Sequence, residues 1–339
     1  MTIISAPHEL VNSDTYVDLR AVLDRRLYLK CEGMNFGGSV KMRAAVAMVA
    51  EAERRSLLGA GTALIESSSG NLGVALSVVA AGKGIPFTCV TDARCNPGTV
   101  AAMRALGTEV VVVEEPHAVD GFLGARLDLV RRRCAADPHL VWLNQYTNEA
   151  NVRAHYEGTA PRILSAIPDL DVLFVGVGTG GTAVGCARYV RDRRGGTRVV
   201  AVDAVGSVTF GGPGGRRLIP GLGASVVPPL FDTSLFDDTV EVAEVETVRG
   251  CRLLSSHGML FGGSTGTVVS GALDWLERND PDRELTSVCI SADMGDRYLD
   301  TVYDDAWVLK HYGPRSLEPM PGARPRARTG RTADLIGAV

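Results

Sequence analysis

The fold is decided by the stretch Val172-Leu-Phe-Val-Gly-Val-Gly-Thr-Gly-Gly-Thr182. Its first four residues form an apolar run without polar alternation, which is typical of a strand covered on both faces. The glycines that follow allow a sharp turn and a close approach of the backbone to an anion, and a helix is expected at 182–193. A strand, a glycine-rich turn and a helix in this order predict an α/β fold whose ligand lies at the carboxyl end of a parallel strand.

The same alternation of strand and helix continues on both sides of this turn. Short apolar runs predict strands at 62–65, 87–90, 109–113, 172–175, 199–202 and 288–291. Helical stretches are expected between them at 42–55, 72–81, 99–106, 118–135, 182–193 and 267–278. Such alternation predicts largely parallel sheets with helices on both faces.

Length and composition restrict the class of protein. A chain of 339 residues is long enough for two domains, and 45% hydrophobic with 22% charged residues is an ordinary globular composition. The formal net charge of −4 gives no reason to expect nucleic acid or a membrane as partner. The apolar runs are strand-sized, far too short to span a bilayer, and the opening residues carry no secretory signal pattern.

The cysteines and histidines give no sign of a metal site. Seven cysteines are scattered along the chain without a C-x-x-C pair, and six histidines show no ligand spacing. An odd, dispersed set of cysteines is typical of reduced thiols. We therefore expect a cytoplasmic protein with neither disulfides nor a metal.

Three further polar turns precede predicted helices. The turn at 35–41 contains two glycines and ends in Lys41, which by itself is more typical of a solvated helix residue. The turn at 66–73 offers hydroxyls, an amide and N–H groups that suit an anion, and the turn at 261–267 contains Ser264. Each of these two turns, taken alone, is adequately explained as a helix N-cap.

The central turn has a second interpretation. Gly176, Gly178 and Gly181 match the pattern G-x-G-x-x-G, and Asp203 ends the next predicted strand. This arrangement is typical of dinucleotide binding in a dehydrogenase. Against it, the element lies in the middle of the chain, and its additional glycine and two threonines suit a compact phosphate cup.

Taken together and in this order, the four turns resemble the cysteine synthase and cystathionine β-synthase family, the fold-type II pyridoxal-phosphate enzymes. The family motifs N-P-x-G-S-x-K-D-R, T-S-G-N-T-G, G-T-G-G-T and G-G/I-S-S/A-G have counterparts at 35–43, 68–73, 178–182 and 262–266. Two more stretches, 145–156 and 220–223, also fit. The resemblance covers about residues 10–312, and six motifs in the same order make it specific.

The resemblance implies an architecture of two doubly wound domains with mostly parallel sheets and the cofactor, pyridoxal 5'-phosphate, in the cleft between them. The larger domain would comprise 1–41 and 150–314, and the smaller, mobile domain 42–149. Residues 315–339, rich in Pro, Gly and Arg, are expected to form a disordered tail. The family is commonly homodimeric.

The resemblance also assigns the cofactor residues. Lys41 would form the internal Schiff base and later remove the Cα proton of the substrate. Asn71 would bond the ring hydroxyl, and Ser264 would face the pyridine nitrogen, where a neutral hydroxyl moderates the electron sink and favours loss of a β-leaving group. The cofactor phosphate would be held by Gly178, Thr179, Gly180, Gly181 and Thr182.

The substrate residues follow in the same way. Tyr146 would line the pocket, and a phosphate leaving group would need a cation, for which Arg126 and Arg94 are the candidates. Either arginine, taken alone, could equally be a solvated surface residue. The substrate carboxylate would be bound by Ser67, Ser68, Ser69, Gly70 and Gln145.

Four departures from the family pattern put plain cysteine synthesis in doubt. Phe36 replaces the usual proline, Met42 the aspartate and Leu72 a threonine, and Arg162 stands where an acidic residue is common. Leu72 lacks the hydroxyl that would contact the substrate carboxylate. These changes, with the stretches 67–76, 201–210 and 219–223, resemble a subgroup that serves 2,3-diaminopropionate formation for siderophores or peptide antibiotics.

That subgroup implies a β-replacement that joins O-phospho-L-serine and L-glutamate through an aminoacrylate, with phosphate released. Three alternatives stay open on the sequence. The first is an O-phosphoserine or O-acetylserine sulfhydrylase that makes cysteine, and the second is the dehydrogenase described above. The third is a non-catalytic regulatory homologue, although a pure binding protein has no need of Lys41, Asn71 and Ser264 together.

Overall fold

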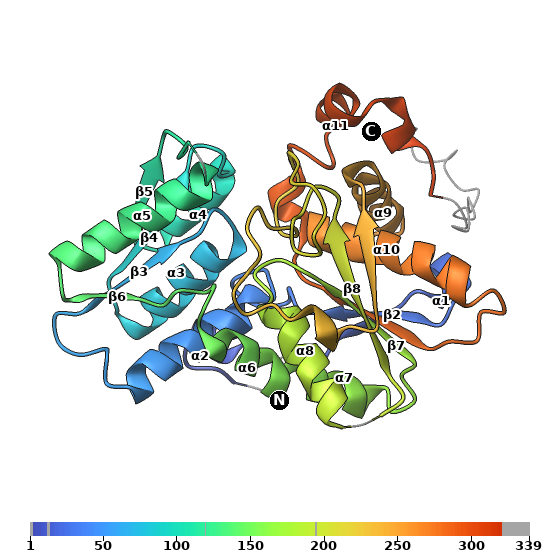
Figure 1. The fold of residues 1–339 in the computed structure, drawn as a ribbon, viewed down its shortest axis with the longest axis horizontal. Coiled ribbons are helices and arrows are strands. Elements are labelled where there is room, and N and C mark those ends of the chain that lie inside the picture. Colours follow the sequence, from blue (N-terminus) through green and yellow to red (C-terminus); the bar gives the residue numbers. More distant parts are fainter. Residues whose placement is uncertain (1–2, 12–13, 119, 194, 321–339) are drawn as a thin grey trace, which may run out of the picture.

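The computed structural model describes residues 3–11, 14–118, 120–193 and 195–320. They form two lobes, each built around its own sheet and each with helices on both faces of that sheet (Figure 1). A mostly parallel sheet with helices on both faces is the arrangement that the alternating pattern of strands and helices predicts for each lobe.

The sheet of the larger lobe contains strands from both ends of the chain. Only the first strand is antiparallel to its neighbour; all other neighbours are parallel. In spatial order the strands are β1 (Tyr16–Asp18), β2 (Leu27–Cys31), β10 (Ser287–Ser291), β7 (Val172–Gly176), β8 (Arg198–Ala204) and β9 (Asp238–Val242).

Two hydrophobic cores cover the faces of this sheet. On one face lie α1 (Arg20–Leu23), α9 (Glu244–Ser256) and α10 (Gly263–Asn279). On the other lie α7 (Thr159–Ala166) and α8 (Gly181–Asp192). The strands between them are buried on both sides, which explains their continuous apolar sequences. The remaining helices are α6 (Glu149–Glu157), packed against α8, and α11 (Asp305–Tyr312).

The smaller lobe contains a four-stranded, entirely parallel sheet. Its order is β5 (Glu109–Val113), β4 (Phe87–Asp92), β3 (Ala63–Ser67) and β6 (Leu140–Trp142). One face is covered by α5 (Gly121–Ala136). The opposite face carries α2 (Lys41–Arg54), α3 (Asn71–Lys83) and α4 (Pro97–Ala105).

All six strands and six helices expected from the sequence are present, most of them with shifted ends. The largest shift is at α10, which begins at Gly263, four residues before the expected start. Gly, Ser and Thr have low intrinsic helix propensity, and burial in the core overrides it there. The sequence did not reveal β2, whose buried Lys30 interrupts the apolar pattern, nor β9 and the three-residue strands β1 and β6.

Two expectations about the chain ends need correction. The N-terminal turn Pro7–Glu9 lies against α3 of the smaller lobe, where Pro7 and His8 approach Gly82, so it is not part of the larger lobe. At the other end Ser316 and Met320 are buried, and Met320 joins the core of the larger lobe, so the expected disordered tail does not begin at residue 315. The rest of that expected tail, 321–339, lies outside the described residues. The boundaries of the smaller domain at 42 and 149, and its mobility, remain predictions.

Candidate active site

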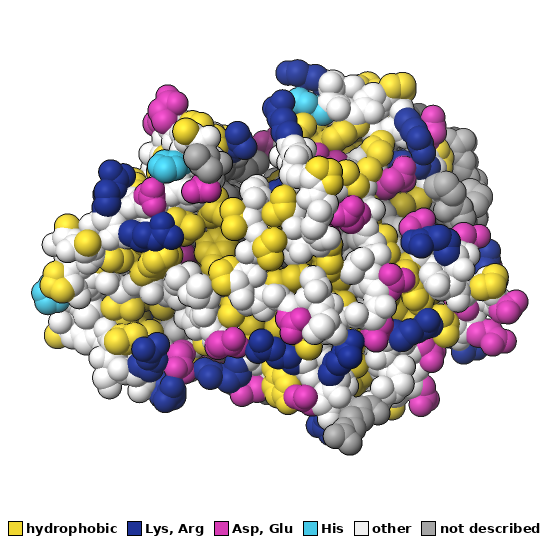
Figure 2. Space-filling view, viewed as in Figure 1, with side chains coloured by type: hydrophobic (Ala, Val, Ile, Leu, Met, Phe, Trp, Pro, Cys, Tyr) yellow, Lys and Arg dark blue, Asp and Glu magenta, His cyan; other side chains and the backbone are white. Residues whose placement is uncertain are grey.

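Predicted site residues of both lobes lie at the boundary between the lobes, near the carboxyl ends of β3, β7 and β10. Asn71, at the start of α3, bonds Asp293, which follows β10, and Lys41 lies within electrostatic reach of the same carboxyl. Figure 2 shows hydrophobic side chains gathered along this boundary, while charged side chains surround the outer surface of both lobes. The structure therefore brings residues from distant parts of the chain to one place.

Lys41 is the first residue of α2 and is half-buried. Burial lowers the pKa of its ammonium group, and the nearby Asp293 carboxyl opposes part of that effect. A lowered pKa favours the neutral amine, which is the nucleophilic form. Lys41 is therefore suited to covalent chemistry through its amine.

A polar cluster that the sequence did not reveal surrounds Asn71. Its Nδ2 donates to Asp293 Oδ2 at 2.9 Å, and the Arg297 guanidinium donates to its Oδ1. Tyr298 Oη donates to Asp293 Oδ2 at 2.6 Å. Burial raises the pKa of the Asp293 carboxyl, while the bonds from Tyr298 and Asn71 lower it. The sequence could have indicated this cluster only by its position, because Asp293, Arg297 and Tyr298 follow the predicted strand 288–291 and ligands bind beyond the carboxyl ends of parallel strands.

Ser264 is the second residue of α10 and is buried. The turn at 220–223 lies directly against it, because a Cβ at Gly221 would stand 2.2 Å from Ser264 Oγ. Gly221 also has a φ of 117°, a conformation that side chains disfavour. The same turn approaches the central glycine loop, where a Cβ at Gly178 would lie 2.9 Å from the Gly221 carbonyl oxygen.

The loop 178–182 has the form of an anion cradle. Among the described residues, none of the backbone N–H groups from Gly178 to Ala183 donates to a backbone carbonyl. These free donors stand at the N-terminus of α8, where the helix dipole also favours negative charge. Gly180 has a φ of 93°, and a Cβ at Gly181 would lie 2.2 Å from Asn151 Oδ1. The residues present therefore fit a phosphate group.

The turn after β3 carries the residues predicted to bind the substrate carboxylate. Gln145 Nε2 donates to the Ser67 carbonyl at 3.0 Å, so Gln145 is fixed against this turn. Ser68 Oγ accepts from the backbone N–H groups of Gly70 and Gly73, which is the ordinary capping role that the sequence also allowed. Within the described part of the chain, the buried hydroxyl of Ser67 has no hydrogen-bond partner. A free hydroxyl and the N–H groups at the start of α3 suit a carboxylate.

Glu66, which the sequence did not single out, lies beneath this turn with no exposed surface. Its carboxyl accepts from Ser67 N at 2.8 Å, Trp142 Nε1 at 3.2 Å and Gln145 N at 3.3 Å. Burial raises the pKa of Glu66 to about 7 despite these bonds. The carboxyl thus connects the ends of β3 and β6 and positions Gln145.

The structure separates the two candidate arginines. Arg126 is buried on α5, with its Nε 3.1 Å from Asp92 Oδ2. It lies close enough to Tyr146 to act on the pKa of that phenol, which burial raises to about 12 and Arg126 lowers. Arg94 is exposed, and its guanidinium stacks 4.7 Å from the ring centre of Phe122. Arg126 and Tyr146 are therefore brought together, and Arg94 is not part of that arrangement.

The residues that depart from the family pattern have different environments. Met42 and Leu72 are buried in the core of the smaller lobe, so neither presents a polar group to the site. Phe36 is 59% exposed. Arg162 pairs with Asp14 at 2.9 Å on the surface.

Asp203, which carried the dinucleotide interpretation, has a structural role. It is fully buried at the end of β8, and its Oδ1 accepts from Ala204 N at 2.8 Å. Burial raises the pKa of the Asp203 carboxyl, and the bonds from Ser207 and Thr209 oppose part of that effect. This carboxyl therefore anchors the loop that follows β8.

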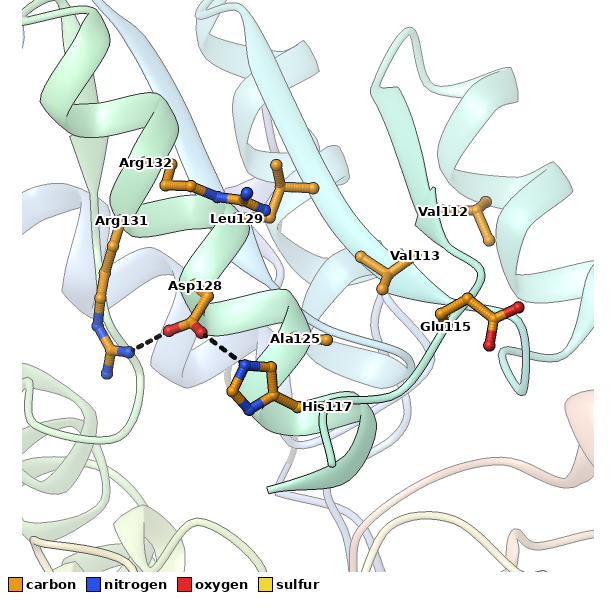
Figure 3. Close-up of a pocket in the computed structure, with 9 residues that line it drawn as sticks. All are labelled: Val112, Val113, Glu115, His117, Ala125, Asp128, Leu129, Arg131 and Arg132. Atoms are coloured by element: carbon orange, nitrogen blue, oxygen red, sulfur yellow. Dashed lines mark hydrogen bonds and ion pairs between the residues drawn. The ribbon is translucent and has the colours of Figure 1, made fainter. Parts of the chain in front are cut away.

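A separate groove of about 650 Å³ lies between β5 and α5 (Figure 3). Asp128 on α5 pairs there with His117 at 3.4 Å and Arg131 at 2.8 Å. None of the predicted site residues lines this groove. No helix within 3–11, 14–118, 120–193 and 195–320 is long and apolar enough to cross a membrane, and the same residues contain no cluster of metal-ligating side chains.

Comparisons with known proteins identify the family of the chain. The sequence pattern of the family described as "Pyridoxal-phosphate dependent enzyme" matches residues 14–293. The chain is 38% identical over 322 residues to N-(2-amino-2-carboxyethyl)-L-glutamate synthase of Ralstonia nicotianae, covering 94% of this chain and 95% of that one. It is also 38% identical to the protein of the same name from Cupriavidus metallidurans, covering 91% and 92%. A crystal structure of a hydrogen sulfide-producing enzyme from Fusobacterium nucleatum superposes with a TM-score of 0.81 at 31% identity, covering 88% of this chain and all of that one.

Proposed function

Because the chain belongs to the family of pyridoxal-phosphate dependent enzymes, we propose that it joins O-phospho-L-serine to L-glutamate, releasing phosphate and giving N-(2-amino-2-carboxyethyl)-L-glutamate. The identity of 38% over almost the whole length of two synthases of that name carries this conclusion. The chain is a β-substituting enzyme of the cysteine synthase type, and its cofactor is pyridoxal phosphate.

The cofactor would be held by residues of both lobes. Lys41 would bind it covalently through its amine, and the free N–H groups of 178–182 would bind its phosphate. Asn71 would contact the ring hydroxyl, and Ser264 the ring nitrogen. When bound, the cofactor supplies an electron sink that stabilises negative charge at the substrate Cα. The lowered pKa of Lys41 supports its second role, which is to accept the Cα proton as a neutral amine.

Asp293 and Arg297 add a constraint on Asn71. In the structure both ends of the Asn71 amide are occupied, Nδ2 by Asp293 and Oδ1 by Arg297. The amide orientation is therefore set by this pair, with the N–H₂ group directed to the carboxyl. An oriented amide restricts which hydrogen bond it can offer to a ring hydroxyl.

The smaller lobe would bind the first substrate. The turn 67–70 and Gln145 offer hydroxyl, amide and N–H groups to the α-carboxylate. Arg126, with Tyr146 close to it, would receive the phosphate leaving group. Asp92 lies 3.1 Å from the Nε of Arg126, and the terminal nitrogens of the guanidinium would bind the leaving phosphate.

The setting of the enzyme is part of the proposal. All seven cysteines are free thiols, and six of them are buried, which supports a reducing compartment such as the cytoplasm. We expect a homodimer, as is common in the family. The product would serve the formation of 2,3-diaminopropionate for a siderophore or a peptide antibiotic.

Supplying the enzyme with O-phospho-L-serine and one nucleophile at a time tests the proposal. With L-glutamate, mass spectrometry should detect N-(2-amino-2-carboxyethyl)-L-glutamate, together with an equal amount of free phosphate. Phosphate released only with sulfide, with cysteine as the product, would identify a sulfhydrylase and overturn the assignment of the nucleophile.

A further inference from the structure

His155 lies on α6 between two threonine hydroxyls. Its Nδ1 is 2.9 Å from Thr159 Oγ1, and its Nε2 is 3.1 Å from Thr182 Oγ1. His155 and Thr159 have no exposed surface, and Thr182 is also buried. Thr159 begins α7, whereas Thr182 ends the loop 178–182 and is the second residue of α8. The imidazole therefore connects the start of α7 to the predicted phosphate site.

The imidazole is neutral in this environment. Burial lowers the pKa of His155 well below its usual value, and the positive charges of Arg43 and Lys41 lower it further. A neutral imidazole has one N–H donor and one acceptor nitrogen. The two threonines must therefore play opposite parts, one donating its hydroxyl proton to the ring and the other accepting from the ring.

The two tautomers have different consequences for Thr182. With the proton on Nδ1, the ring nitrogen Nε2 takes the single hydroxyl proton of Thr182, which then offers only lone pairs to the loop. With the proton on Nε2, Thr182 Oγ accepts from the ring and its own proton stays available. Phosphate oxygens of a dianion only accept hydrogen bonds, so only the second arrangement lets Thr182 donate to them.

We propose that Thr159 is a positioning residue, which acts through His155 to direct the hydroxyl proton of Thr182 toward the cofactor phosphate. In this relay the Thr159 hydroxyl donates to Nδ1, the proton of the ring lies on Nε2, and Nε2–H donates to Thr182 Oγ1. The inference rests on the proposed function only in that a cofactor phosphate occupies the loop 178–182.

The packing of α6 against α8 keeps this relay in place. A Cβ at Gly185 would lie 2.4 Å from the Val152 carbonyl oxygen and 2.8 Å from His155 Cβ, so the two helices are in close backbone contact. One turn earlier on α8, Gly181 lies equally close to α6, because a Cβ there would stand 2.2 Å from Asn151 Oδ1. The ring therefore has little freedom to move away from either hydroxyl.

The test compares two substitutions of Thr159 with a matched control. Thr159→Val keeps the shape but removes the hydroxyl, and Thr159→Ser retains it. Thr108→Val removes a buried threonine hydroxyl of the same kind, bonded to Ser77 Oγ at 2.7 Å in the smaller lobe. The cofactor dissociation constant of each apoprotein, the phosphorus-31 shift of the bound cofactor and the melting temperature are measured.

Thr159→Val should raise the cofactor dissociation constant on the order of tenfold and move the phosphorus-31 shift, because a hydrogen bond to a charged group is lost. Thr159→Ser should stay close to the wild type in both. Thr108→Val should lower the melting temperature but leave both cofactor measurements unchanged. A Thr159→Val protein that is less stable but binds the cofactor like the wild type would overturn the relay.

Nitrogen-15 spectra of histidine-labelled holoenzyme test the tautomer directly, with the His155 signals assigned by their loss in His155→Gln. The relay predicts a proton on Nε2 and an unprotonated Nδ1, and the opposite pattern would contradict it. These outcomes are separate from the proposed function. A wild-type protein that binds no cofactor would refute the proposed function, whereas normal cofactor binding with an unaffected Thr159→Val protein refutes the relay alone.

Discussion

The two sides of the site are built from different parts of the polypeptide. At the predicted phosphate site the larger lobe presents main chain, namely the N–H groups of 178–182 and the turn at 220–223 packed on Ser264. The smaller lobe presents charged side chains from separate elements, with Arg126 paired to Asp92 and Glu66 buried beneath the 67–70 turn. A main-chain site has little freedom to change its ligand. A side-chain site can change its substrate through single substitutions, so the smaller lobe is where specificity should reside.

Lys41, where α2 begins, would serve both the cofactor and the substrate, and its loss should have the largest effect. Lys41→Ala should lower activity on the order of 10³-fold or more, because both the covalent link and the proton acceptor disappear. The visible absorption of the bound cofactor should be lost with it. Lys83→Ala, which removes an exposed ion pair with Glu53, is the control and should behave like the wild type. Full activity in Lys41→Ala would contradict both roles of this residue, the covalent link to the cofactor and the acceptance of the Cα proton.

Arg126 tests whether specificity lies in the smaller lobe. Arg126→Lys should lower kcat/KM for O-phospho-L-serine about 100-fold, because a bidentate contact to phosphate is lost. With O-acetyl-L-serine, which has no phosphate, the same variant should change little. Lysine is chosen because alanine would leave the buried Asp92 carboxylate without the positive charge that it pairs with. Arg94→Ala is the matched control, and an equal loss in that variant would place the phosphate elsewhere.

Glu66 tests the electrostatics of the substrate side. Its folded pKa of about 7 lies above the ordinary value of 4.5, so the unfolded chain releases this proton at lower pH than the folded protein does. The contribution of Glu66 to stability is therefore present below pH 4.5 and is lost as the pH rises through about 7. Between pH 5 and 7 the wild type should lose about 2 kcal/mol from this group.

Glu66→Gln cannot titrate, and urea unfolding at several pH values measures the difference from the wild type. The difference in free energy of unfolding between the two proteins should shift in favour of the variant as the pH rises. A difference that stays constant from pH 5 to 7 would show that the Glu66 carboxyl titrates normally.

Gly181 should give the smallest of these effects, on the cofactor side. Gly181→Ala places a Cβ against Asn151, and the adjustment should raise the cofactor dissociation constant about tenfold. Gly195→Ala, where a Cβ meets nothing within 4 Å, is the control. Selectivity between phosphoserine and acetylserine should not change, because this loop does not contact the leaving group. A change in selectivity without a change in cofactor affinity would reverse the roles of the two sides.

The same difference explains what the sequence revealed. Main-chain sites need glycines at fixed spacings after a strand, so the loop 178–182 and the turns around Lys41, Asn71 and Ser264 could be recognised once all four were read together in their order along the chain. Asp293, Arg297 and Glu66 belong to no such motif, because a single charged residue has many ordinary explanations. Their importance comes from burial and from partners distant in sequence, which only the fold provides.

The strands, too, could be predicted only where the sequence carries a recognisable pattern. Long apolar strands such as β7 and β10 were predicted because burial on both faces leaves continuous hydrophobic runs. Strand β2 was missed because it carries the buried Lys30, whose ammonium pairs with Glu32 at 3.3 Å. The expected tail began too early, at residue 315, because a Pro- and Arg-rich composition gives no sign that Met320 reaches the core.

The most direct test of the account is to identify the lysine that holds the cofactor. The chain has only four lysines, Lys30, Lys41, Lys83 and Lys310, so the result is unambiguous. The holoenzyme is treated with borohydride to fix the cofactor covalently, then digested, and the modified peptide is sequenced by mass spectrometry. The account predicts modification of Lys41 alone. A cofactor found on Lys30, Lys83 or Lys310, or on no lysine, would contradict it.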